Sequence, residues 1–401
     1  MRISLYLFNP DNDLALANGD VNFVPPRQAL KMAYDLAILP AWYVDGCAAV
    51  WVPDVHAGRV VAGELFEIWP GVRITGREEM DPEEIACVEP WGWNPMLVNY
   101  LRKSGIAETV LPNDRQMGRI REYAHRSFSV RLLKELAGSE YFCGSAECFC
   151  TVQQVKNFVE QTPRSLLKAP WSGSGKGLFW GEGEYTYLMD RWVRNVLEKQ
   201  QGVVAEKVYD KVEDFAMEFY SDGKGKCRFA GYSLFQTDNR GVYKRNIMAL
   251  DGYIQDRLSR YVPADLLLLL SGKLEKRLSD SVGTCYRGYL GVDMMVCRFG
   301  EKPFFRIHPC VEINLRMNMG MVSRLIYDRI VLPGKYGFFS VDYFKSSTDL
   351  LKDHREAVNR YPLVVQDGKI VSGYLSLTPV GEDTNYRASI RIGETDYAIV
   401  L

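Results

Sequence analysis

The chain has 401 residues, of which 49 are basic and 50 acidic, so its formal net charge is −1. A chain of this length has room for two or three domains and a sizeable apolar core. The balanced charge gives no support for a nucleic-acid partner. The longest strictly aliphatic run, residues 266–270, is too short to cross a bilayer, so we expect no membrane partner either.

Nine cysteines are scattered along the chain. Cys143, Cys148 and Cys150 lie near one another, but no pair has the spacing of a zinc site. Reduced, buried thiols are typical of proteins kept in a reducing compartment. The apolar start at residues 3–8 is too short for a signal peptide. We therefore expect a cytoplasmic protein.

Residues 1–115 have the pattern of a separate α/β unit. Short apolar runs predict strands at residues 3–8, 48–52 and 72–75, and helices at 29–37 and 96–103. The first of these helices follows Pro25 and Pro26, and proline is well suited to a first helical turn. Alternation of strands and helices favours a partly parallel sheet.

The polar residues 9–13 follow the first predicted strand directly. In an open α/β sheet, ligands bind beside this edge of the strands, so Asn9, Asp11 and Asp13 are candidate substrate residues. Asparagine, proline and aspartate also form turns, and a plain turn is the alternative. Residues 89–95, rich in tryptophan and proline, form either a packed loop or a wall of the same cleft.

The rest of the chain mixes helices and strands in a different order. Apolar spacing predicts helices at residues 126–137, 151–161, 184–199 and 262–282. Strands are expected at 165–180, as a hairpin around a glycine-rich loop, and at 203–235 and 289–315. An Asp-Gly pair predicts a hairpin turn within residues 362–371, and strand-like sequence continues to residue 401.

The glycine-rich loop and a lysine before it form the first chemical motif. Lys168 ends the apolar run that precedes the loop. The loop comprises Ser172, Gly173, Ser174, Gly175, Lys176 and Gly177. Small residues let backbone N–H groups approach phosphate oxygens closely. The spacing excludes a Walker P-loop, because Pro170 and Gly177 stand where that motif needs glycine and serine or threonine.

Glu312 and Asn314 form the second motif. They are two residues apart, so on a strand their side chains point to the same face. One or two oxygen ligands from the protein, completed by nucleotide phosphates, suit Mg²⁺. The two motifs together predict a site for ATP and one or two Mg²⁺ ions.

These motifs, in this order, resemble the ATP-grasp superfamily over roughly residues 115–330. The resemblance implies two α+β subdomains that bind ATP between them. The implied metal ligands are Asp293, Glu312 and Asn314, and the implied catalytic residues are Lys168 and Arg316.

The resemblance also implies how the nucleotide binds. The implied residues outside the loop are Glu206, Lys207 and Val208 at the adenine edge, Asp214 or Glu213 at the ribose, and Arg126 in place of a phosphate-binding lysine. Arg240 and Lys244, with Arg245, either neutralise the transferring phosphoryl group or lie on a solvated loop. His308 is expected to be a packed residue rather than a catalytic base.

We therefore predict a protein of mixed α/β and α+β class in four parts. These are an N-terminal α/β domain (1–115), a first ATP-grasp subdomain with the glycine-rich loop (116–202), a second subdomain with the adenine and metal residues (203–335) and a β-rich C-terminal extension (336–401). The predicted activity is that of an ATP- and Mg²⁺-dependent ligase, which joins a small-molecule or peptide carboxylate to an amine through an acyl phosphate. A small-molecule kinase and a non-catalytic ATP-binding protein on the same fold are the alternatives.

Overall fold

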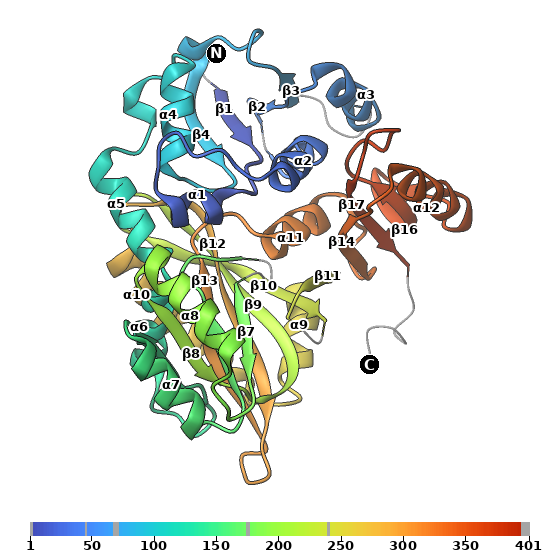
Figure 1. Ribbon diagram of the computed structural model, residues 1–401. Helices are drawn as coiled ribbons and strands as arrows, with labels where there is room; N and C mark the ends of the chain where they lie inside the picture. The colour runs from blue at the N-terminus through green and yellow to red at the C-terminus, as the bar shows by residue number, and fades with distance from the viewer. Residues whose placement is uncertain (1–2, 45, 67–71, 174–176, 239–240, 394–401) are drawn as a thin grey trace.

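Four parallel strands form the N-terminal sheet of the computed structural model (Figure 1). The structure describes residues 3–44, 46–66, 72–173, 177–238 and 241–393. The strands, in the order β3-β2-β1-β4, are β1 (Ile3–Leu7), β2 (Ala48–Trp51), β3 (Val72–Thr75) and β4 (Ile85–Pro90). The strand order reverses at β1, so the loops after β1 and β4 meet at the edge where open sheets bind ligands.

The helices of this unit correct two sequence predictions. They are α1 (Asn12–Asn18), α2 (Arg27–Asp35), α3 (Val55–Phe66) and α4 (Pro95–Lys103). Residues 9–13 are not all loop, because α1 begins at Asn12 and places Asp13 in its first turn. Residues 89–95 are not one loop either. β4 ends at Pro90, and the side chain of Asn94 accepts a hydrogen bond from the Leu97 N–H at 2.9 Å, which caps α4.

A second, antiparallel sheet carries the glycine-rich loop. It follows α5 (Asp114–Tyr123) and α6 (Arg126–Leu136) in the chain. Its strands, in the order β5-β8-β6-β7, are β5 (Ala146–Phe149), β6 (Ser165–Lys168), β7 (Leu178–Gly181) and β8 (Val203–Lys207). The helices α7 (Val152–Gln161) and α8 (Tyr187–Gln200) pack on it through a core that includes Val159, Leu167 and Val193. The predicted hairpin is confirmed, since β6 pairs with β7 on either side of the loop.

The third sheet has nine strands and runs into the C-terminal region. Its order is β13-β12-β9-β10-β11-β14-β17-β16-β15. The strands are β9 (Asp210–Asp222), β10 (Cys227–Thr237), β11 (Tyr243–Met248), β12 (Arg287–Arg298), β13 (Phe305–Asn314), β14 (Gly337–Tyr343), β15 (Val364–Gln366), β16 (Lys369–Ser376) and β17 (Tyr386–Ile392). The predicted β-rich C-terminal region is therefore confirmed, and its strands join the sheet through the pairing of β11 with β14.

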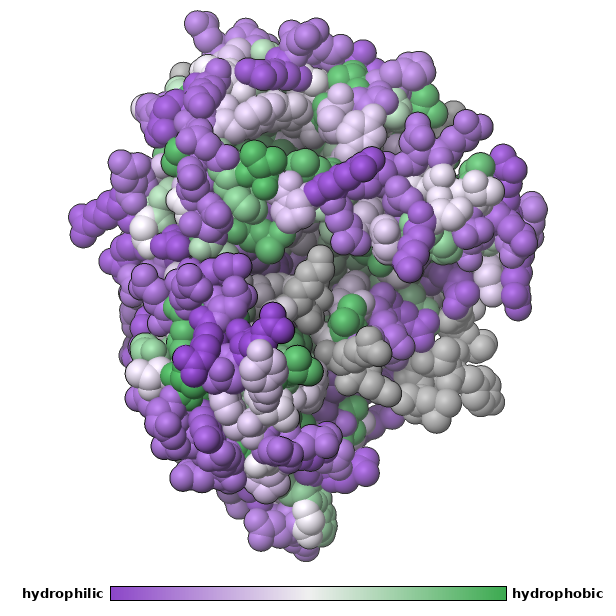
Figure 2. All heavy atoms as spheres, viewed as in Figure 1, coloured by the Kyte–Doolittle hydropathy of each residue, from purple (hydrophilic) through white to green (hydrophobic). Residues whose placement is uncertain are grey.

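Helices cover this large sheet on both of its faces. They are α9 (Asp251–Leu258), α10 (Ala264–Ser281), α11 (Met319–Ile330) and α12 (Ser347–Arg360), of which α10 was predicted. Buried leucines of α10 share a core with Phe215 and Phe219, whereas α11 shares another with Met248 and Phe339. In the described ranges, none of the helices has the length and apolar character needed to span a membrane. Figure 2 shows that the face seen in Figure 1 is mostly hydrophilic.

The N-terminal unit is bound to the C-terminal strands. Both carboxylate oxygens of Asp35, at the end of α2, are used: one accepts the backbone N–H groups of Asn385 (2.9 Å) and Tyr386 (3.0 Å), and the other binds Lys31 (2.6 Å). The indole of Trp42, which is buried, donates to the carbonyl of Leu377 at 2.6 Å. The sheet of β9–β17 thus continues into a contact with the first domain.

We predict that Asp35→Ala lowers the free energy of unfolding by about 2–4 kcal/mol, because two backbone N–H groups lose their acceptor in a poorly hydrated interface. Lys31→Ala is the matched control and should cost less than Asp35→Ala, because both backbone N–H groups keep their acceptor. Urea unfolding followed by tryptophan fluorescence measures both. Equal losses for the two variants would show that the N–H acceptor role of Asp35 is unimportant.

Candidate functional site

β12 and β13 bring the three predicted metal ligands together. Asp293 and Glu312 are direct cross-strand partners, so their side chains share one face of the sheet. The side-chain amide of Asn314 donates a hydrogen bond to Oδ2 of Asp293 at 3.0 Å. Two carboxylates and an amide therefore meet at the end of one strand pair.

The charges at this position fit a divalent cation. Burial, and then the charge of Glu312, raise the pKa of Asp293 to about 7. A cation beside both carboxylates would offset that repulsion. Two carboxylates and one amide supply oxygen donors only. Such a donor set fits Mg²⁺, which takes few protein ligands and fills its shell with phosphates and water.

Arg126 joins this position to the glycine-rich loop. It is the first residue of α6, and only 5% of its surface is exposed. Its Nη2 donates to Oε2 of Glu312 at 2.7 Å, while Nη1 donates to the carbonyl of Ala169 and the hydroxyl of Ser172. The structure thus places the arginine predicted to replace a phosphate-binding lysine between the loop and the candidate metal ligands.

Lys168 lies at the end of β6 and forms an ion pair with Glu206 on the neighbouring β8. Both side chains are buried. Val208, the last residue assigned to the adenine edge, donates its backbone N–H to the carbonyl of Arg164 at 3.0 Å. An adenine base bound beside residues 206–208 would therefore form its hydrogen bonds with polar groups other than the Val208 N–H.

The geometry distinguishes the two candidates for the ribose. Asp214 accepts a hydrogen bond from the hydroxyl of Thr237 at 2.8 Å and forms an ion pair with Lys211. Glu213 points to the opposite face of β9, where Arg257 binds it at 2.8 Å. Asp214 is on the face that carries Asp293 and is favoured.

The glycine-rich loop is described in part. Ser174, Gly175, Lys176 and the separate candidate Arg240 lie outside the described residues. The N–H of Ala169 donates to the carbonyl of Gly177 at 2.8 Å, which closes the loop at its base. Gly177 has a φ of 71°, a backbone conformation that favours glycine.

The remaining candidates of the second subdomain have ordinary surroundings. Lys244 is exposed on β11. The guanidinium of Arg245 lies 3.7 Å from the ring centre of Phe338. His308 is buried on β13 with its ring edge-on to Tyr209, and burial lowers its pKa to about 4. These observations favour packing roles for Arg245 and His308.

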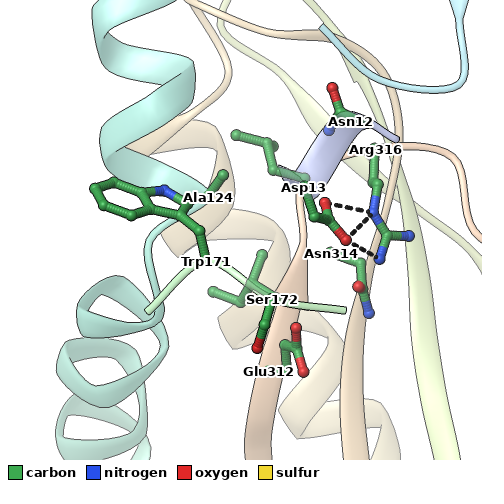
Figure 3. Close-up of a pocket in the computed structure, with 10 residues that line it drawn as sticks. Asn12, Asp13, Ala124, Trp171, Ser172, Glu312, Asn314 and Arg316 are labelled. Carbon is green, nitrogen blue, oxygen red and sulfur yellow. Dashed lines mark hydrogen bonds and ion pairs between the residues drawn. The ribbon is translucent and has the colours of Figure 1, made fainter. Parts of the chain in front are cut away.

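The three N-terminal candidates differ in their contacts. Asn9 donates its side-chain amide to the carbonyl of Gly92 (2.8 Å) and accepts the N–H of Gly92 (3.2 Å), so it joins the loops after β1 and β4. Asp11 is buried, and burial raises its pKa. Asp13 reaches from α1 to Arg316, just after β13 (Figure 3). Burial opposes the ionisation of Asp13, but Arg316 outweighs it and lowers the pKa of that carboxyl.

A pocket lies where α1, the glycine-rich loop and the end of β13 meet (Figure 3). Its lining includes Asp13, Trp171, Ser172, Glu312, Asn314 and Arg316. Residues from the first domain and both later regions therefore face one shared space beside the candidate metal ligands.

A buried polar group that was not predicted from the sequence lies next to the candidate metal ligands. Glu218 on β9 is fully buried and accepts a hydrogen bond from the side chain of Asn318 at 2.7 Å. Asn318 also caps α11 by accepting the N–H of Met321 at 2.9 Å. An added Cβ at Gly320 would contact Ser233 and Glu218, so the first turn of α11 approaches the sheet closely. The asparagine before a helical run was the available signal.

Comparison with solved structures identifies the fold of the chain. No protein-family model matches this chain, and no curated protein matches its sequence. The N5-carboxyaminoimidazole synthetase of Staphylococcus aureus, solved with ADP, is similar with a TM-score of 0.50 and 10% identity, over 100% of this chain and 96% of that one. The biotin carboxylase of Campylobacter jejuni, solved as a β-γ-ATP complex, has a TM-score of 0.50 and 12% identity, over 99% and 89% of the two chains. The chain has the ATP-grasp fold predicted from its motifs.

We predict that Glu218 makes the protein less stable as pH rises. Burial raises the pKa of Glu218 from 4.5 to about 8, so the folded state retains a proton that the unfolded state loses. The free energy of unfolding should therefore fall between about pH 4.5 and 8, by on the order of 4 kcal/mol from this group. In the Glu218→Gln protein, the free energy of unfolding should not fall by this amount over the same pH range.

Urea unfolding at pH 5, 6.5 and 8 tests the prediction, with Glu301→Gln as an exposed control. Parallel pH profiles for Glu218→Gln and the unsubstituted protein would contradict it.

Proposed function

We propose that this chain is an ATP- and Mg²⁺-dependent ligase that joins a carboxylate to an amine through an acyl-phosphate intermediate. The observation that carries the proposal is the grouping of Asp293, Glu312 and Asn314 at one strand end. Arg126 connects that group to the glycine-rich loop. The arrangement has the parts that phosphoryl transfer needs, which are oxygen ligands for a metal, cations for phosphate and a loop of small residues.

ATP is the proposed nucleotide. The two similar enzymes were solved with ADP and as a β-γ-ATP complex, which supports an adenine nucleotide on this fold. In this chain Lys168 and the backbone of the loop would hold the phosphates, with Glu206, Lys207 and Val208 at the base and Asp214 at the ribose. Arg126 would contact the terminal phosphates, and the position of its guanidinium between the loop and Glu312 supports this.

Mg²⁺ would be held by Asp293, Glu312 and Asn314. When bound, the ion neutralises charge that develops on the phosphates during transfer. Asn314 orients Asp293 through its amide, and Arg126 holds Glu312 in place before the nucleotide and the ion bind. These contacts keep the ligand oxygens on one face of the sheet.

The pocket beside these ligands would take the carboxylate substrate. A carboxylate oxygen attacks the γ-phosphorus of ATP, and ADP leaves. The nitrogen of the amine then attacks the acyl carbon, phosphate leaves, and the nitrogen releases a proton as the amide forms. Arg316 would bind the carboxylate and its phosphorylated form through charge-assisted hydrogen bonds. Water must be excluded during these steps because acyl phosphates hydrolyse.

The substrates in this proposal are a small-molecule or peptide carboxylate and an amine, and the expected location is the cytoplasm. A kinase on the same fold would form a phosphoester instead of an amide, so product analysis separates the two activities. A non-catalytic nucleotide-binding protein would release no ADP with any substrate pair. The complete set of metal ligands favours catalysis over that last alternative.

We predict that Glu312→Gln reduces Mg²⁺-dependent ADP release by at least 100-fold, because it removes metal charge stabilisation worth several kcal/mol. The assay is an ADP-release screen of amino acids and small carboxylates supplied in pairs. Glu301→Gln, in the exposed connection between β12 and β13, is the control and should behave like the unsubstituted protein.

Thermal unfolding of Glu312→Gln accompanies the assay, because the substitution also alters the ion pair with Arg126. Turnover by a folded Glu312→Gln protein at the unsubstituted rate would show that the metal site is misplaced.

A further inference from the structure

Asp13 and Arg316 form a two-pronged ion pair between the first domain and the end of β13 (Figure 3). Nε of Arg316 donates to Oδ1 of Asp13 at 3.0 Å, and Nη2 donates to Oδ2 at 2.9 Å. The two residues are 303 positions apart in the sequence. Such a bidentate pair defines the orientation of a guanidinium as well as its position.

The remaining donors of Arg316 are partly used as well. Nη1 donates to the carbonyl of Met317 at 3.2 Å. Asp13 and Met317 therefore take three of the five N–H groups that a guanidinium carries. The two N–H groups not engaged by these described partners are one on Nη1 and one on Nη2.

Arg316 lies in a largely buried position beside the candidate metal ligands. A guanidinium remains charged in proteins, so Arg316 places a positive charge beside the candidate metal ligands. Only 13% of the Arg316 side chain is exposed, and it lines the pocket that Glu312 and Asn314 also line. Charged donors in a poorly hydrated pocket bind an oxyanion more strongly than the same donors in water.

The position of Asp13 is itself fixed by its surroundings. Arg121 of α5 donates to the carbonyls of Leu16 (2.7 Å) and Ala17 (3.3 Å) at the end of α1, and its guanidinium lies over the Trp171 ring. On the other side, a Cβ added to Gly173 would contact Oδ2 of Asp13 and lie 3.3 Å from Nη2 of Arg316. The glycine-rich loop therefore touches the ion pair directly.

We propose that Asp13 is a positioning residue: it holds Arg316 so that the guanidinium presents its remaining Nη1 and Nη2 N–H groups to an oxyanion in the pocket. The oxyanion is the substrate carboxylate or its phosphorylated form, so this inference rests on the proposed function. The first domain then completes the reaction centre through α1, and Asp13 does not contact the substrate, unlike in the sequence prediction.

The test observes Arg316 directly in full-length protein labelled with ¹⁵N-arginine. The Nε–H signal of Arg316 is assigned by its loss in Arg316→Lys. In the unsubstituted protein this N–H should exchange slowly with water, because Asp13 holds it. Acetate and inorganic phosphate, titrated separately with Mg-ADP present, represent the two oxyanions, and at least one should shift the Nη signals while Nε–H stays protected.

Asp13→Asn keeps the shape of the side chain and removes its charge. It should weaken the affinity for the responding anion about 10-fold or more, a loss typical of removing a residue that orients a binding group. Asp13→Glu, which retains the charge, should recover part of that affinity. Glu79→Gln removes one carboxylate of an exposed ion pair in the same domain and is the matched control.

The outcomes separate this inference from the proposed function. Calorimetric binding of Mg-ADP and the ADP-release screen test the nucleotide site, and Asp13→Asn should leave Mg-ADP affinity unchanged. Rapid exchange of the Arg316 Nε–H in the unsubstituted protein would overturn the inference without any variant. So would an Asp13→Asn protein with a lower melting temperature but unaltered anion affinity, or anions that leave the Nη signals unmoved.

Discussion

The pairing of Arg126 constrains the rest of the site, because a buried guanidinium without partners is strongly unfavourable. Its partners are Glu312 on β13 and, in the glycine-rich region, the carbonyl of Ala169 and the hydroxyl of Ser172. Removing any one of them leaves part of a buried charge unpaired. α6, the loop and β13 are therefore fixed relative to one another, and this places the proposed phosphate-binding segment beside the proposed metal ligands.

The first domain is held against this frame at two separate places. Near the site, α1 contributes Asp13 to Arg316, and Arg121 binds the carbonyls at the end of the same helix. Farther away, Asp35 and Trp42 bind backbone groups of the C-terminal segment. β14–β17 belong to the same sheet as β12 and β13, so both attachments connect the first domain to one sheet. The pocket is consequently built on a single framework, although its walls come from distant parts of the chain.

Local patterns predicted the parts of the site that depend on short-range geometry. The two-residue spacing of Glu312 and Asn314 gave a shared strand face, and the glycine-rich run gave the hairpin. The pairings that complete the site are tertiary. Glu218 and Asn318 are 100 positions apart, and the spacing of apolar residues along the chain does not predict a partner so distant in sequence. α1 was missed because Asn-Pro-Asp-Asn-Asp has strong turn propensity and the helix is only seven residues long, so tertiary contacts override the local preference.

The charges explain how one site could accept both a polyanion and a divalent cation. Three cations of the described site are each paired with one carboxylate, namely Arg126 with Glu312, Lys168 with Glu206 and Arg316 with Asp13. Under the proposed function, phosphates would attract Arg126 and Lys168 while Mg²⁺ attracts Glu312 and Asp293. On binding, Arg126 would replace its contact with Glu312 by one with the phosphates. Glu312 would replace its contact with Arg126 by one with Mg²⁺, so neither charge is left unpaired. The Arg316–Asp13 pair lies outside this exchange, which is why its orientation can remain constant while the nucleotide enters.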